Sequence, residues 1–166
     1  MPERSTVRRA RRDKRAGKSA STQAGEFVRE EMRHIREGKH GARSTKQAIA
    51  IGLSKARRSG VQLAPPKRGT TSSKTRRAAK RDLARGKRRH AAAAPTRSRA
   101  VVGALKRERS SSASRSALSR QARASARKRS AAQRSASARK AVRTKGAARR
   151  SASARKAART RARQAR

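Results

Sequence analysis

The sequence lacks cysteine, tryptophan and tyrosine, and its single aromatic residue is Phe27. Without cysteine the chain forms no disulfide, no cysteine-based zinc site and no catalytic thiol. Leu, Ile, Val and Phe fill only 15 of the 166 positions. Chains so poor in these residues and so highly charged are usually disordered. We therefore expect a packed core only where apolar residues cluster, and no run is long enough for a transmembrane helix.

Acidic residues are also scarce: 8 Asp and Glu face 52 Lys and Arg, which gives a net charge of +44. The charge is unevenly distributed, since residues 1–21 carry +6, residues 22–66 carry +5 and residues 67–166 carry +33. No acidic residue follows position 109. Such a chain is expected to bind a polyanion.

The middle segment shows helical periodicity. Ala24, Phe27, Val28, Met32 and Ile35 form one apolar stripe, which predicts a helix that ends near Gly38. Residues 44–47 fit a capping box, and the apolar spacing after them predicts a second helix that ends at Gly60. The predicted core of this hairpin is Phe27, Val28, Met32, Ile35, Ile49, Leu53, Val61 and Leu63.

The fold class expected from these patterns is mainly α: a small helical hairpin at about residues 22–63, with flexible flanks. We expect a disordered basic arm over 1–21, the hairpin domain over 22–66 and a basic linker with short helices over 67–109. In that linker the patterns predict helices at 74–85 and 97–109. Residues 110–166 are rich in Ser, Ala and Arg and repeat Ala-Ser-Ala-Arg-Lys three times. We expect this tail to be largely disordered, or helical only when bound.

No catalytic constellation is evident. His34, His40 and His90 have no cysteine partner and no carboxylate pair at a useful spacing, so His34 is expected to be a surface residue. Glu30, Glu31 and Glu37 could be imagined as a metal site, but we expect a solvated helix face that pairs with neighbouring arginines. The chain is therefore predicted to be no enzyme, and to hold neither a metal nor a cofactor.

The predicted nucleic-acid contacts are cations that meet backbone phosphates. Lys39, Arg43 and Lys46 surround the expected N-terminus of the second helix, where free N–H groups suit a phosphate. An ordinary turn with solvated charges explains this segment equally well. The tail repeats supply the other predicted contacts, Arg127, Lys128, Arg139, Lys140, Arg155 and Lys156. The absence of aromatic residues after Phe27 favours duplex DNA over base-stacked single strands.

Residues 26–60 resemble a small uncharacterised bacterial domain family. The resemblance rests on Gly38-Lys39 after the first helix and on Ser44 to Arg57, where Gly52 replaces the alanine of the family pattern. It implies a bacterial origin and no established activity. The tail is similar in composition to the basic tails of histone H1-like bacterial nucleoid proteins, although those tails favour Lys and Pro.

We interpret the chain as a cytoplasmic, nucleoid-associated protein that binds and compacts DNA without sequence preference. The expected partner is nucleic acid, duplex DNA first, with no membrane and no small-molecule substrate. Two alternatives stay open. The chain could be an RNA-binding or ribosome-associated accessory protein, or an adaptor whose hairpin docks a protein partner.

Overall fold

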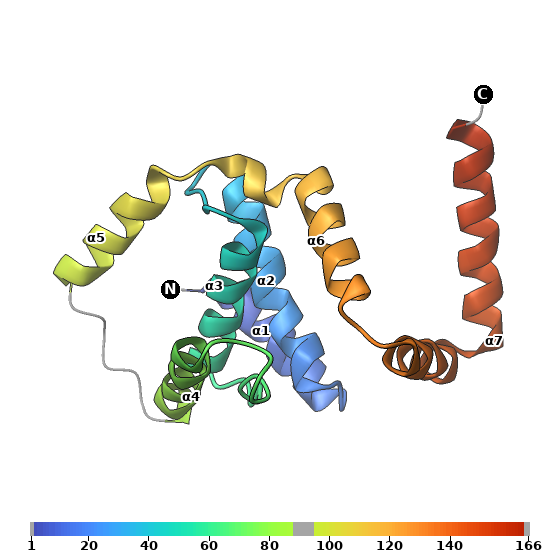
Figure 1. Cartoon of the computed structure of the whole chain (residues 1–166), viewed down its shortest axis with the longest axis horizontal. Helices are drawn as coiled ribbons and strands as arrows, with labels where there is room; N and C mark the ends of the chain where they lie inside the picture. The colour runs from blue at the N-terminus through green and yellow to red at the C-terminus, as the bar shows by residue number, and fades with distance from the viewer. Residues whose placement is uncertain (1, 88–94, 165–166) are drawn as a thin grey trace. The chain divides into compact units, whose positions relative to one another are not determined.

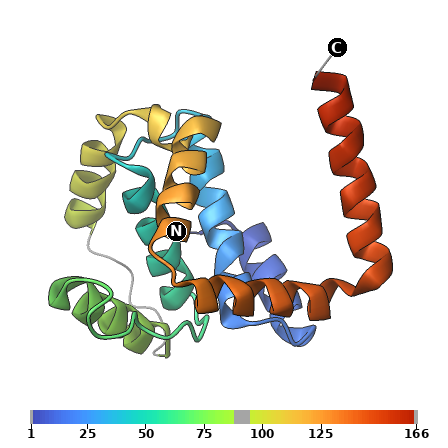
Figure 2. The ribbon, with the colours of Figure 1, turned by 45° about the vertical axis from the view of Figure 1, so that its right-hand side comes forward.

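The computed structural model describes residues 2–87 and 95–164, and within these ranges the chain is helical, with no β-strand. It divides into two compact units, Met1–Gln121 and Ala122–Arg166 (Figures 1 and 2). The expected fold class is wrong for the N-terminal arm and the C-terminal tail, because both of these segments, which the sequence predicts to be disordered, form helices. The elements are α1 (Arg4–Arg15), α2 (Ala20–Arg36), α3 (Thr45–Arg58), α4 (Ser73–Lys87), α5 (Pro95–Lys106), the 3-10 helix η1 (Ser110–Ala113), α6 (Arg115–Arg127) and α7 (Ala131–Gln164).

Helix α1 replaces the expected disordered arm and packs against α2. Its buried residues Thr6, Ala10 and Asp13 lie on one face, at spacings of four and three. This face is built from small side chains, so a search for Leu, Ile and Phe could not find it. Arg9 Nε lies 2.7 Å from Glu26 Oε2 of α2, and this ion pair adds to the contact.

Helices α2 and α3 form the hairpin that the periodicity predicts, and the capping box at the start of α3 is present. The Ser44 hydroxyl accepts a hydrogen bond from the Gln47 N–H at 3.2 Å. The Gln47 amide oxygen accepts one at 2.8 Å from the N–H of Arg43, one residue earlier than the standard pattern. Gly38 and Gly60 follow the two helices with φ of 71° and 90°, which suits glycine at a helix end.

The predicted core residues lie in two apolar clusters. Phe27, Met32, Ile35 and Val61 are buried, and the other four predicted residues are partly buried and pack against the clusters. One cluster also takes Ala10 from α1, and the other takes Ala113 from η1. Segments outside the hairpin therefore complete a core that would otherwise be small.

Residues after α5 return to the loop that joins α2 and α3. The Thr45 hydroxyl donates a hydrogen bond to the Ser112 carbonyl at 2.6 Å, and Arg36 Nε donates one to the Ala113 carbonyl at 2.9 Å. These two bonds fix η1 across the end of the hairpin. The sequence patterns do not indicate this contact, because no apolar stripe marks η1.

The predicted helices of the linker exist with shifted ends. The helix expected at 74–85 is α4, whose first turn is capped by the Ser72 hydroxyl, and the helix expected at 97–109 is α5. Asp82 of α4 accepts a hydrogen bond from the Ser54 hydroxyl of α3 at 2.5 Å. His90 and residues 91–94, between the two predicted helices in the sequence, lie outside the described residues.

The second unit contains the end of α6 and the long helix α7. The expectation of a disordered tail is wrong here, because alanine and arginine are among the strongest helix formers. Repulsion between arginines three or four residues apart costs only roughly a few tenths of a kcal/mol per pair. Ser130 and Gln133 also form a reciprocal capping box at the start of α7. Gly146, with φ 66° and ψ 170°, interrupts the helical geometry, and both views show the bend there (Figures 1 and 2).

Candidate nucleic-acid interface

The cations of the second unit have no acidic partner within that unit. Between Ala122 and Arg166 the sequence has 17 Lys and Arg and no Asp or Glu. Except for Ala157, every residue of α7 whose side chain is described is exposed. The predicted contacts Arg127 and Lys128 are exposed at the end of α6 and just after it, and Arg139, Lys140, Arg155 and Lys156 are exposed on α7.

The spacing of these cations sets them on defined sides of α7. An α-helix turns by about 100° about its axis for each residue. In the part of α7 after Gly146, five cations therefore lie within a sector of about 120° around the axis. Those five are Arg149, Arg155, Lys156, Arg159 and Arg163. In the part before the bend, Arg139, Lys140 and Arg143 share a side. Each half of α7 therefore carries a stripe of positive charge, while Arg134, Arg150 and Arg161 lie outside these stripes.

The other three predicted phosphate contacts belong to the first unit, around the start of α3. Lys39 Nζ lies 2.9 Å from Glu37 Oε2, and this contact lowers the pKa of the Glu37 carboxyl. Arg43 and Lys46 are exposed. Because Lys39 already has an anionic partner, this turn carries less unbalanced charge than α7.

Most acidic residues of the first unit form ion pairs within that unit. Asp13, Glu26, Glu31 and Asp82 each pair with a lysine or an arginine. Glu3 pairs with His34 and Arg33, and these contacts lower the pKa of its carboxyl to about 2. Since these carboxylates already have cationic partners within their own unit, they leave little negative charge for the second unit.

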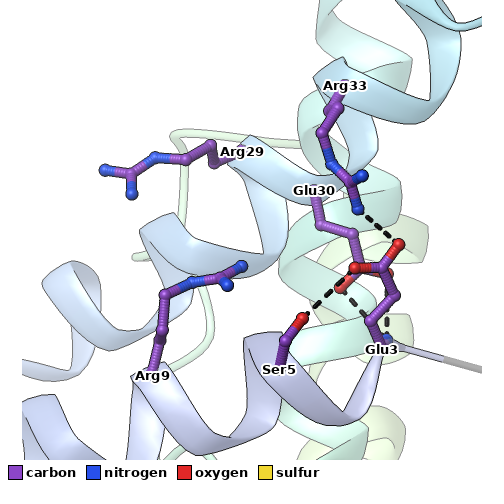
Figure 3. Close-up of a pocket in the computed structure, with 6 residues that line it drawn as sticks. All are labelled: Glu3, Ser5, Arg9, Arg29, Glu30 and Arg33. Atoms are coloured by element: carbon purple, nitrogen blue, oxygen red, sulfur yellow. Dashed lines mark hydrogen bonds and ion pairs between the residues drawn. The ribbon is translucent and has the colours of Figure 1, made fainter.

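A pocket of about 400 Å³ lies where the start of α1 meets α2. Figure 3 shows Glu3 in contact with Ser5, Glu30 and Arg33, while Arg9 and Arg29 make no contact with the other residues drawn. The Glu3 backbone N–H lies 3.3 Å from both carboxylate oxygens of Glu30. Arg33 pairs with Glu3, and Arg9 pairs with Glu26. The pocket is therefore an internal ion-pair network. Its lining residues are Glu3, Ser5, Arg9, Arg29, Glu30 and Arg33.

Two expectations about histidine and glutamate are wrong. Glu30 and Glu31 are buried between helices and do not form a solvated face, and His34 has a side chain only 13% exposed. Glu37, in contrast, is exposed and pairs with Arg33 as expected. The chain also brings His40 to the same place, so that one ligand atom each of Glu31, His34 and His40 lies within 4.8 Å of the others. The Glu31-x-x-His34 spacing is a signal for this cluster. The position of His40, which follows a turn, could not be read from periodicity.

Comparison with known proteins relates one part of the chain to a sequence family. Residues 11–68 match the model of DUF6496, a family of unknown function. The match covers part of α1, all of α2 and α3, and the segment that follows them. It agrees with the expectation of an uncharacterised domain in this part of the chain. No curated protein and no solved structure gives a significant match.

The DUF6496 segment carries most of the buried core and the histidine cluster, whereas the charged stripes of α7 lie outside it. None of the helices in the described ranges combines the length and the apolar content needed to cross a membrane.

Proposed function

We propose that the chain is a non-enzymatic nucleic-acid-binding protein that contacts the phosphates of duplex DNA and compacts it, in the bacterial nucleoid. The observation that carries this proposal is the exposed positive charge of the second unit. Its 17 cations have no acidic residue in their own unit, and six of the eight acidic residues of the chain form ion pairs within the first unit. A polyanion that releases its counterions on contact is the partner that such charge favours.

Helical geometry supports a duplex as the target. An α-helix is about 10–12 Å across, and the major groove of B-DNA is about 12 Å wide. Arginine, which supplies most of the cations, can make bidentate contacts with phosphate. Phosphate contacts carry no base information, so binding through these stripes is independent of sequence.

The only aromatic residue also supports a duplex. Phe27 is 1% exposed and lies in the core, so its ring cannot stack on bases. Proteins that bind single strands generally stack bases on exposed aromatic rings. We therefore expect weaker binding to single strands than to duplexes at the same salt concentration.

The test is fluorescence anisotropy of the full chain with labelled duplexes of unrelated sequence, over a series of salt concentrations. If roughly ten cations contact phosphates, log K falls with log[salt] with a slope of about −9. A quadruple variant removes four of the predicted contacts: Arg139→Gln/Lys140→Gln/Arg155→Gln/Lys156→Gln. Its slope should be less negative by about 0.9 for each phosphate contact that is lost. Arg139→Lys/Arg155→Lys keeps the charge and should leave the slope unchanged.

A slope near zero, or a strong preference for one duplex sequence, contradicts the proposal. Duplex RNA and single-stranded DNA are measured in parallel at matched salt. Tighter binding to duplex RNA than to DNA would favour the RNA-binding alternative, since both duplexes present phosphates but differ in groove shape.

A further inference from the structure

A buried carboxylate and two histidines meet at the C-terminal part of α2. Glu31 and His34 are three residues apart and therefore share a face of the helix. His40 lies in the connection to α3. One ligand atom from each residue lies within 4.8 Å of the others, and the two imidazole rings are perpendicular, with centroids 6.1 Å apart.

Glu31 is the most buried member of this cluster, with a side chain 1% exposed. Its Oε2 lies 2.6 Å from Lys55 Nζ, which leaves Oε1 directed at His40 Nε2, at 3.2 Å. These are ion-pair distances, yet neither carboxylate oxygen has a hydrogen bond of normal geometry. A buried carboxylate oxygen without a hydrogen bond is costly unless a cation compensates it.

The hydrogen bond at the other ring nitrogen of His40 leads to the same need for a cation beside Glu31. Its Nδ1 lies 3.1 Å from the Gly41 carbonyl oxygen, which can only accept, so Nδ1 carries the hydrogen. In a neutral ring Nε2 then presents a lone pair to the Glu31 oxygen. Two acceptors facing each other at 3.2 Å need either a proton or a metal ion between them.

His34 is oriented in a related way. Its Nε2 lies 2.8 Å from Glu3 Oε1, and a carboxylate accepts, so Nε2 donates. The other ring nitrogen of a neutral His34 therefore keeps its lone pair. A histidine that donates one N–H to a carboxylate while the other nitrogen binds a metal is a common arrangement in metalloproteins.

We propose that Glu31, His34 and His40 bind one divalent transition-metal ion, of which zinc is the best match. Zinc takes His nitrogen at about 2.0–2.1 Å and carboxylate oxygen at about 2.0–2.2 Å, so tetrahedral ligands lie roughly 3.3–3.5 Å apart. The His40–Glu31 separation of 3.2 Å is close to this value. The ligand atoms of the cluster are at most 4.8 Å apart. Side-chain movements of about 1.5 Å would bring the most distant pair to the separation that tetrahedral zinc ligands have.

The ion would act as a staple within the first unit. It would join the last turns of α2 to the connection that leads into α3, next to the Lys55 ion pair from α3 itself. Small domains with few large apolar residues often need such a cross-link. This role is independent of nucleic-acid binding, which the proposed function assigns to the second unit.

The test uses the full chain without a polyhistidine tag, freed of nucleic acid at high salt and stripped with EDTA. Calorimetric titration with zinc sulfate should show one zinc ion per chain. His34→Asn and His40→Asn should each weaken the binding at least about tenfold. The matched control is His90→Asn, the third histidine of the chain, which should bind zinc as tightly as the wild type.

The wild-type chain supplies a second readout that does not depend on any variant folding. Its thermal midpoint should rise as zinc is added and return when EDTA is added, since a ligand that binds only the folded state stabilises it. A wild-type midpoint that zinc does not move overturns the proposal. Binding that His90→Asn weakens as much as His34→Asn does also overturns it. In either case a proton, as in a Glu31–His40 ion pair, fills the place of the metal.

Discussion

Gly52 of α3 lies directly against Val28 of α2: a Cβ atom added at Gly52 would lie 2.7 Å from the Val28 Cα. That distance is shorter than real Cβ contacts, and the atom it meets belongs to the backbone. The absence of a side chain at this one position therefore sets how closely the two helices of the hairpin approach.

The first prediction concerns this contact. Gly52→Ala should destabilise the first unit by up to about 2 kcal/mol, because an overpacking cost of about 1–3 kcal/mol outweighs the gain of about 1 kcal/mol in helix propensity. Gly25→Ala is the matched control, because Gly25 is exposed within α2 and its added Cβ meets nothing within 4 Å. It should stabilise the chain by about 0.5–1 kcal/mol. Urea midpoints of the two variants that move in the same direction would contradict this prediction.

A second prediction ranks two isoleucines of the hairpin. Ile35 is fully buried, whereas Ile49 is only partly buried. Substitutions of buried isoleucine by alanine typically cost about 2–5 kcal/mol, so Ile35→Ala should cost more than Ile49→Ala. Chemical unfolding of the full chain, followed by circular dichroism, measures both. If both variants lost the same free energy of unfolding, burial would not determine how much each isoleucine contributes to stability.

The third prediction concerns pH. Contacts with His34 and Arg33 hold the pKa of Glu3 at about 2, below its ordinary value of 4.5. A lowered folded-state pKa means that the Glu3 contribution is fully present above pH 4.5 and is lost as the pH falls towards 2. Thermal midpoints of Glu3→Gln and the wild type should therefore differ most above pH 4.5 and converge near pH 2. A difference that stays constant over this range would show that Glu3 acts through its shape and not its charge.

A fourth prediction concerns the bend in α7. Gly146 has φ 66° and ψ 170°, a conformation that essentially only glycine adopts. Gly146→Ala should therefore favour one continuous helix through this position. Spin labels introduced by Ala138→Cys and Ala154→Cys, in a chain that has no other cysteine, should move towards the separation of about 24 Å along a straight helix of 16 residues. An unchanged distance would show that other residues hold the bend.

The hairpin could be predicted from sequence because its large apolar residues repeat with a helical period. Phe27 and Ile35 fall on one stripe, and the Ser44 cap marks the next helix. Helix α1 could not be predicted in this way, since its inward face consists of Thr6, Ala10 and Asp13. Those side chains pack through close approach and ion pairing, which no scale of hydrophobicity records.

The helical tail departs from the sequence-based expectation for a different physical reason. Repulsion between arginines argues against a helix, but each repulsive pair costs little compared with the summed helix propensity of alanine and arginine. The histidine cluster depends on the path of the chain between His34 and His40, and the place of η1 depends on the hydrogen bond from Thr45 to Ser112. Contacts of this kind follow from tertiary structure, which local patterns do not encode.

The hydrogen bond from Thr45 to Ser112 joins residues 67 positions apart and so closes a long loop. Contacts between such distant positions form late in folding, because chain entropy opposes their encounter. The entropic cost of closing a loop grows only with the logarithm of its length, by about 0.6 kcal/mol for each doubling. Extra residues inserted between α3 and η1 would therefore slow the docking of η1 while leaving its final stability almost unchanged.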